Sequence, residues 1–405
     1  MHNQILSASA AVATAAFLAL PNDASALSDL VLSVDCTNGQ TVSRALSRPA
    51  VFGRRLVIVV QGTCTENVTI ERDDVVLRAQ TSGSGINAAD PAKSAIDIIS
   101  ARRVELVDLS VASGHHGVRA IGGASVAIRG GAVRNAVRTG IYVLGGASAL
   151  VDGSTIENHG GAGVQAEGGS ITLTNSTVRA NQFSGVTAFR GGQAKLGDID
   201  DAGTVCCGNT IAENRLDGVT VADSASALLY GNVIERNGST TRRWGILAVN
   251  ESVANIRGGN EIRNNGSADG GGGVFARAST IRTGAGDAPL NPTTNEISGS
   301  FVGMLAELNA SLDLRPGFSV TGNVLNGLTL NHGTRLRIEG TTISGNGQNG
   351  IFARGTSTVD VIGGANAVTA NGAFGLLCIG NLTVYNGNNA GIVGNTVGDV
   401  SCTPY

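Results

Sequence analysis

Three residues in the central part of the sequence could act chemically on a substrate: Asp217, Arg277 and Glu307. Glycoside hydrolysis needs two carboxylates, roughly 5 Å apart for retention of configuration and roughly 6.5–9.5 Å apart for inversion. A lyase needs a base, such as arginine or tyrosine, and a cation or amide that neutralises a uronate. Arg277, Arg354 and Tyr142 are available for that chemistry. We therefore take Asp217, Arg277 and Glu307 as the candidate catalytic residues.

Residues suited to binding a sugar occur in the same part of the sequence. One lengthened interval carries Arg243 and Trp244, the only tryptophan, and the next carries Asp269. Aromatic rings suit flat sugar faces, and the planar guanidinium of arginine can pair with a carboxylate through two parallel hydrogen bonds. With Arg354 and Tyr142, these residues form the predicted substrate-binding set.

One short phrase, repeated through the chain, determines where these residues lie. A glycine is followed by Val, Ile, Leu or Met, then a free residue, then usually Ala or Val. The glycines of the phrase are Gly117, Gly140, Gly163, Gly185, Gly218, Gly245, Gly273, Gly303, Gly327, Gly350 and Gly375. Self-similarity at a period of roughly 20 to 50 residues marks a stacked-repeat protein. Each interval holds further short strand-like pieces and no helical periodicity. The predicted fold is all-β, a single-stranded right-handed parallel β-helix.

Alternation along each phrase should place its two apolar side chains inside the coil and the residues between them outside. The outward residues then form two columns along the solenoid. The first column reads Arg119, Tyr142, Gln165, Thr187, Thr220, Leu247, Phe275, Leu305, Thr329, Phe352 and Leu377. The second column includes Arg277, Glu307 and Arg354. This face is either a binding groove or a solvated surface on which Arg277 and Glu307 form an ion pair of little energetic value.

Asparagines precede most of these glycines at a nearly constant distance. Asn135 and Asn158 stand five residues before their glycines, and five others stand four before theirs: Asn181, Asn214, Asn323, Asn346 and Asn371. Side-chain amides stacked from coil to coil can hydrogen-bond along the axis and satisfy turn backbone. We predict a structural ladder of asparagines.

The intervals lengthen between Gly185 and Gly303. The additions at residues 237–244 and 264–272 lie between the turn asparagine and the glycine, so they should flank the same face on neighbouring coils. Those at residues 197–208 and 283–294 fall elsewhere in the coil. Insertions grouped on one side of a solenoid usually mark its working surface. The run from Asp269 to Gly273 suggests a flexible loop.

The N-terminal region predicts export and a cap. Residues 1–26 resemble a signal peptide, although no Lys or Arg precedes the apolar run; the alternative is a helix that stays attached. A strand and a short helix at residues 40–47, with Thr41 as N-cap, would follow within residues 27–54 and cover the first coil. The β-helix is expected over residues 55–405, with residues 81–93 as a loop. We expect a secreted, periplasmic or cell-surface protein.

Six cysteines suit an oxidising compartment. Cys36 with Cys64, and Cys378 with Cys402, would staple the two ends of the solenoid. The adjacent Cys206 and Cys207 could form a vicinal bridge, remain free thiols or link two molecules.

Composition excludes several classes of partner. The formal net charge is −3 and charged residues make up 15% of the chain, so nucleic acid is not an expected partner. After the N-terminal segment, no window holds 18 uninterrupted apolar residues, so no membrane span is predicted. No cluster of acidic residues, histidines or cysteines has ligand spacing. We predict neither a metal nor another cofactor.

The repeated phrase, the N-terminal signal and cap, and the segment from Val57 to Ile70 resemble the pectate-lyase-like right-handed β-helix superfamily, and most closely its uncharacterised bacterial β-helix-repeat members. In related enzymes the outward strand face is the substrate groove. The segment with Asp217 resembles the Asn-Thr-Asp-Gly segment of polygalacturonase-type hydrolases, and His115 and His116 resemble their Gly-His-Gly segment. Their order is reversed here, and Asp200 and Asp201 fall outside the expected strand start, so membership of that hydrolase family is rejected.

Two functions remain open from the sequence. The first is an exported protein that binds, and in its sharper form cleaves, an acidic polysaccharide on the central face. The second is a non-catalytic structural or adhesive protein of the cell surface or envelope. The aromatic and charged face with its grouped loops favours the first, whereas the scattered carboxylates favour the second.

Overall fold

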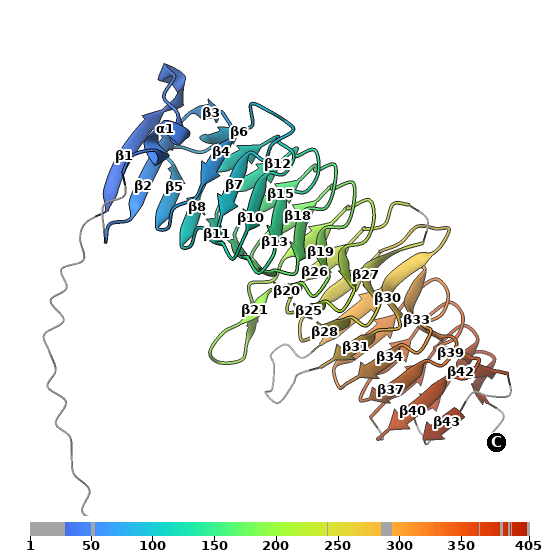
Figure 1. The fold of residues 1–405 in the computed structure, drawn as a ribbon. Coiled ribbons are helices and arrows are strands. Elements are labelled where there is room, and N and C mark those ends of the chain that lie inside the picture. Colours follow the sequence, from blue (N-terminus) through green and yellow to red (C-terminus); the bar gives the residue numbers. More distant parts are fainter. Residues whose placement is uncertain are drawn as a thin grey trace, which may run out of the picture.

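The computed structural model describes residues 29–49, 53–240, 242–284, 294–363, 365–380, 384–387, 389 and 391–402. In these residues the chain winds into a solenoid whose successive coils stack along one axis (Figure 1). Each regular coil gives one short strand to each of three parallel sheets, which we call sheets A, B and C. The predicted right-handed parallel β-helix is confirmed.

The strands of each sheet come from successive coils. Sheet A contains β1 (Leu30–Asp35), β2 (Leu56–Gln61), β5 (Val75–Ala79), β8 (Val104–Val107), β11 (Ser125–Arg129), β14 (Ser148–Asp152), β17 (Ser170–Thr174), β20 (Gln193–Leu196), β25 (Ser226–Leu229), β28 (Val253–Ile256), β31 (Thr280–Thr283), β34 (Ser311–Leu314), β37 (Arg335–Glu339), β40 (Thr358–Ile362) and β43 (Val384–Gly387). Sheet B contains β3 (Thr63–Thr65), β6 (Gly85–Asn87), β9 (Ser110–Ala112), β12 (Ala132–Arg134), β15 (Thr155–Glu157), β18 (Thr177–Arg179), β23 (Thr210–Ala212), β26 (Val233–Glu235), β29 (Glu261–Arg263), β32 (Asn295–Ser298), β35 (Phe318–Thr321), β38 (Thr342–Ser344), β41 (Ala367–Thr369) and β44 (Ile392–Val393). Sheet C contains β4 (Val68–Ile70), β7 (Ile96–Ile99), β10 (Val118–Ile121), β13 (Ile141–Leu144), β16 (Val164–Glu167), β19 (Val186–Phe189), β24 (Val219–Ala222), β27 (Arg243–Val249), β30 (Gly271–Arg277), β33 (Val302–Glu307), β36 (Leu328–Leu330), β39 (Ile351–Arg354), β42 (Phe374–Ile379) and β45 (Gly398–Ser401).

The repeated phrase forms sheet C. In β16, Val164 and Ala166 are buried, whereas Gln165 between them is partly exposed. The next coil repeats this pattern in register, since Gln165 pairs with Thr187. Buried Val, Ile, Leu and Ala therefore stack coil upon coil into a continuous apolar interior, whose removal from water drives folding. The predicted first outward column is confirmed by the register of the strands from Arg119 to Leu377.

An asparagine ladder runs along the turn between sheets B and C. The backbone and side-chain amides of Asn214 both donate to Oδ1 of Asn237, at 3.1 and 2.9 Å, and Asn237 donates in the same way to Asn265. The predicted members Asn181, Asn214, Asn323, Asn346 and Asn371 all take part. A second ladder, which the sequence analysis missed, joins Asn209, Asn232, Asn260 and Asn295 between sheets A and B.

Asn135 and Asn158 were wrongly assigned to the ladder. Both are exposed and have left-handed backbone angles, with φ of 59° and 62°. The next residue occupies the ladder position in each coil. His159 is fully buried there: its Nδ1 accepts from the backbone of Ala136, and its own backbone N–H donates to Asn181. Asparagine tolerates φ near +60° better than most residues, which explains the offset by one position.

Replacing Asn237 with alanine is expected to destabilise the central coils strongly. The change removes two bonds accepted from Asn214 and two donated to Ile211 and Asn265, all at buried sites. Buried polar groups without partners cost about 1–3 kcal/mol each, so we expect a loss of roughly 3–5 kcal/mol. Urea unfolding measures it. The control is Asn255→Ala on the outer face of β28, which should change stability by less than about 0.5 kcal/mol.

The predicted cap and disulfides are confirmed. Helix α1 (Val42–Leu46) begins after Thr41, whose hydroxyl accepts from the backbone N–H of Arg44. A 3-10 helix, η1 (Cys36–Asn38), precedes it. Disulfides join Cys36 to Cys64 and Cys378 to Cys402, each between neighbouring coils.

Three other expectations have different outcomes. Residues 81–93 are not only a loop, because Gly85–Asn87 forms β6; a Cβ on Gly85 would lie 1.8 Å from the carbonyl oxygen of Ser110, so only glycine fits this short strand. Cys206 and Cys207 are not joined to each other, so the vicinal bridge is wrong, while free thiols and a link between two molecules stay predictions. They lie in and beside a hairpin, β21 (Asp198–Ile199) and β22 (Val205–Cys206), that projects from the stack (Figure 1). The proposed signal peptide lies outside the described residues.

Candidate functional site

Sheet C is widest in the central coils. Strands β27 and β30 have seven residues each and β33 has six, whereas β24 has four (Figure 1). The extra residues lie at the side where the chain enters from sheet B, so Arg243 pairs with Gly271 and Trp244 with Gly272. The two additions predicted to flank one face are therefore neighbours, but they end within extended strands rather than in free loops.

Glycines make this widening possible. Gly271 has φ of +95°, and a Cβ there would lie 2.0 Å from the carbonyl oxygen of Arg243. A Cβ on Gly272 would lie 1.9 Å from the carbonyl oxygen of Val302 and 3.0 Å from the indole of Trp244. The prediction of a flexible loop from Asp269 to Gly273 is therefore wrong beyond Gly270. The neighbouring strands and the indole occupy the space that a side chain at either position would need, so only glycine fits there.

Replacing Gly272 with alanine should disturb the site and the fold together. The added methyl must displace backbone on β33, and we expect a loss of roughly 2–4 kcal/mol in the free energy of unfolding. Emission of Trp244, the only tryptophan, should shift at the same time. Gly123→Ala serves as the comparison: its φ is +73° with no atom within 4 Å of a Cβ, so it should lose only about 1 kcal/mol.

A cleft of about 520 Å³ lies over the widened part of sheet C. Its floor is apolar, with Leu247, Phe275 and Leu305 from three successive first-column positions. Trp244 also lines the cleft but is only 7% exposed, and its ring stacks on Phe275 with centroids 5.1 Å apart. Trp244 thus supports the floor more than it offers a free face to a sugar.

Asp217 lies at one end of this cleft and is 2% exposed. Its Oδ1 accepts a 2.8 Å hydrogen bond from the backbone N–H of Trp244, and its Oδ2 lies 3.9 Å from Nη1 of Arg243. Burial raises the pKa of Asp217 to about 6, although the hydrogen bond and Arg243 oppose that shift. Near pH 6 this carboxyl can therefore either give or take a proton.

A second cavity of about 630 Å³ adjoins the first. The two share Asp217, Arg243 and Leu247, so together they form one groove along sheet C. Tyr142 lies in the second cavity; its hydroxyl donates to Glu167 at 2.5 Å, and burial, with Glu167, raises its pKa to about 12. The ring of His116 lies 4.7 Å from that of Tyr142, and burial lowers the pKa of His116 to about 4.

The structure groups only some of the predicted site residues. Asp217, Arg243, Trp244, Asp269 and Glu307 all line the first cleft. Arg277 lies beside Glu307 on the next coil, with Nε 3.9 Å from Oε1. Tyr142 belongs to the second cavity. Arg354 lines neither cavity; it lies on β39 and donates to Asn331 at 2.6 Å.

The carboxylates are spread along the solenoid. Asp217 precedes β24 and Glu307 ends β33, three coils away, which is about 14 Å along the axis at about 4.8 Å per coil. Asp217 and Glu307 therefore do not form the pair that glycoside hydrolysis requires. The structure adds Phe301 and Val302, which no sequence signal distinguished, and Arg242, which lies in the same lengthened interval as Arg243.

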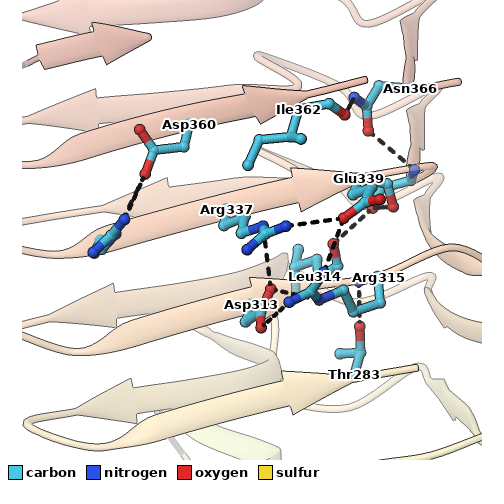
Figure 2. A network of polar contacts seen from close by, with 11 residues as sticks. Thr283, Asp313, Leu314, Arg315, Arg337, Glu339, Asp360, Ile362 and Asn366 are labelled. Atoms are coloured by element: carbon cyan, nitrogen blue, oxygen red, sulfur yellow. Dashed lines mark hydrogen bonds and ion pairs between the residues drawn. The ribbon is translucent and has the colours of Figure 1, made fainter. Parts of the chain in front are cut away.

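Another charge cluster lies on the outer face of sheet A, away from the groove (Figure 2). Arg315 contacts Asp313 and Glu339, each at 2.9 Å, and Arg337 also contacts Glu339, at 3.2 Å. The backbone N–H of Arg315 donates to Thr283. Because each charge in this cluster has an opposite partner, the cluster has no free charge to offer a ligand, unlike the groove.

The part of the chain that the structure describes lacks both a metal-binding cluster and a membrane-spanning helix. It holds no group of three His, Cys, Asp or Glu side chains arranged as metal ligands would be. It also holds no helix of the length and apolarity needed to cross a membrane.

Comparisons with known proteins agree with this architecture. The family described as the right-handed beta helix region matches residues 75–199. The match agrees with the coils of the structure, which show a right-handed parallel β-helix fold. No curated protein matches the chain in sequence.

Solved structures share the fold at low identity. The A-module of a mannuronan C-5 epimerase from Azotobacter vinelandii is 16% identical, with a TM-score of 0.50, and the match covers 85% of this chain and 90% of that one. The catalytic unit of a thermostable α-1,3-glucanase from Streptomyces thermodiastaticus is 13% identical, with a TM-score of 0.53, covering 92% of this chain and 71% of that one. At such identities the likeness concerns the fold.

Proposed function

We propose that the protein binds an acidic polysaccharide along the groove of sheet C and cleaves it near Asp217. The observation that supports this most is the union of two cavities, through Asp217, Arg243 and Leu247, into one extended groove on one face of a rigid solenoid. Such a shape suits a linear polymer rather than a compact metabolite. Two solved structures with this coil are named for action on mannuronan and on an α-1,3-glucan, which supports a glycan ligand.

The cations of the groove support an acidic glycan. Arg138 and Arg242 line it and have no ion pair within 4.0 Å among the described residues. Arg243 has only the 3.9 Å contact with Asp217. Guanidinium groups without close acidic partners are suited to bidentate contact with a carboxylate. Arg277 could hold a further carboxylate, because its contact with Glu307 is long and its side chain is 53% exposed.

Asp217 is the group best suited to proton transfer. It is buried, it borders both cavities and its pKa is raised to about 6, so both protonation states are accessible near neutral pH. Tyr142 lies at the other end of the groove. Its hydroxyl proton is already donated to Glu167, so we assign Tyr142 to ligand binding rather than to proton transfer.

A polysaccharide panel tests this function. The protein is immobilised and challenged with acidic and neutral glycans, and retention is read together with ultraviolet absorbance of unsaturated uronates and with new reducing ends. Retention of acidic glycans with either product supports the proposal. Loss of all retention would exclude it, and retention without product would favour the second candidate below.

The second candidate is a non-catalytic structural or adhesive protein of the cell surface. It is favoured by the separation of Asp217 from Glu307 and by the distance of Arg354 from the groove. In both cases we propose an exported protein, because two disulfides tie the solenoid and such bonds persist in oxidising compartments. Mass measurement of protein recovered outside the cytoplasm should locate the new N-terminus near residue 27.

A further inference from the structure

The floor of the groove changes chemistry at the point where its two cavities meet. On one side the first-column residues are Gln165, Thr187 and Thr220, which can hydrogen-bond. On the other side they are Leu247, Phe275 and Leu305, which cannot. All six are partly exposed, so both halves of the floor are open to a ligand.

We propose that the apolar half is a subsite for O-acetylated sugar units of the polysaccharide. This inference rests on the proposed function and adds the substitution pattern of the ligand. Leu247, Phe275 and Leu305 extend over two coil spacings, about 10 Å, and the apolar area continues into Phe301 and Val302. A bare sugar ring has one apolar face, whereas apolar residues here line the cleft both on its floor and beside it, with Arg242, Asp269 and Glu307 in the charged part of the lining. Methyl-bearing substituents would fill that extra apolar space.

Polar contacts in the cleft suit the carbonyl oxygen of an acetyl group. On a uronate unit, which has hydroxyls and no amine, an acetyl group is an ester. The Nε of Arg243, which lines the cleft, is buried without a hydrogen-bond partner among the described residues, so an ester carbonyl would supply the missing acceptor.

The test compares two forms of one polymer. O-acetylated mannuronan and the same preparation after mild alkaline de-O-acetylation are titrated against the full chain, and quenching of the single tryptophan reports binding. We expect roughly tenfold tighter binding of the acetylated form, as a buried methyl group typically gives. Leu305→Ser should remove most of this preference while retaining affinity for the deacetylated form. Thr187→Ala, in the polar half, should weaken both forms equally and leave the ratio unchanged.

The outcomes separate this inference from the function on which it rests. Equal binding of the two forms, or a preference that survives Leu305→Ser, would overturn the acetyl subsite and leave polysaccharide binding intact. Failure to bind either form, together with failure on the wider glycan panel, would overturn both. A preference that disappears in both Leu305→Ser and Thr187→Ala would also count against the subsite, because it would mean that the apolar half has no special role.

Discussion

Replacing Arg243 with alanine is expected to weaken binding of an acidic polysaccharide about 30-fold while the solenoid stays folded. Among the residues that the structure describes, Arg243 is the only arginine that borders both cavities, and its side chain is 38% exposed. Loss of a guanidinium that pairs with a ligand carboxylate in this partly exposed cleft costs on the order of 2 kcal/mol, which is about 30-fold in the dissociation constant. Titration of the variant at low and moderate salt measures the effect.

Arg335→Ala is the matched control for this experiment. Arg335 lies on β37 in sheet A, is 70% exposed and pairs with Asp360. Its removal should leave glycan affinity within about twofold, since exposed ion pairs contribute little. If both variants lose affinity to the same extent, binding depends on overall charge rather than on the groove. Trp244→Ala is a poor test of the same question, because the buried indole also supports Phe275.

Replacing Asp217 with asparagine should remove cleavage and, at neutral pH, stabilise the protein. Burial raises the pKa of Asp217 in the folded state to about 6, well above the usual value for an aspartate, so the folded state holds this proton more tightly than the unfolded state does. The contribution of Asp217 to stability is therefore greatest at low pH and declines as pH rises from about 4 to about 6. Over that range the loss amounts to roughly 3 kcal/mol. Asparagine can still accept from the N–H of Trp244 and carries no charge to bury.

Unfolding by urea between pH 4 and pH 7, with product assays on the same samples, measures both effects. The stability of the wild-type protein should decline relative to that of Asp217→Asn across this range. Asp152→Asn gives a comparison with a flat pH dependence. Hydrogen bonds from Asn175 and Thr174 lower the pKa of Asp152, so its ionised form stabilises the fold across this range and that stability is lost only below about pH 4. Asp152→Asn should therefore be destabilised by a nearly constant amount between pH 4 and pH 7. A destabilised Asp217→Asn at pH 7 would contradict the interpretation of Asp217 as a buried, strained acid.

The repeat made most of the fold predictable. Because one glycine phrase recurs in register, Gln165 and Thr187 could be assigned to one outward column before any coordinates, and Val164 and Ala166 to the interior. The ladder was predictable for the same reason, except at His159, where a different residue type fills the asparagine position. Gly85–Asn87 was missed because a three-residue strand that begins with glycine has no periodicity to detect.

The site was less predictable, because it depends on departures from the repeat. Lengthened intervals indicated which coils carry the candidate site, but not that Gly271 and Gly272 extend a strand under Trp244. Sequence spacing also could not show that Asp217 and Glu307 are three coils apart along the groove, since residue type alone grouped them. The burial that raises the pKa of Asp217 arises from packing against the next coil, which no local pattern encodes.

The two disulfides have a consequence for how the solenoid comes apart. A stack in which each coil contacts only its neighbours would ordinarily fray from its terminal coils. Cys36–Cys64 and Cys378–Cys402 each bind an outer coil to the one inside it, so the outermost hydrogen bonds cannot open freely. Amide exchange should then begin in the interior, around the lengthened coils between β19 and β33, in the oxidised protein. Reduction should move the first exchanging amides to the outermost strands, β1 and β45, so the redox state would decide where the stack begins to open as well as how firmly it holds.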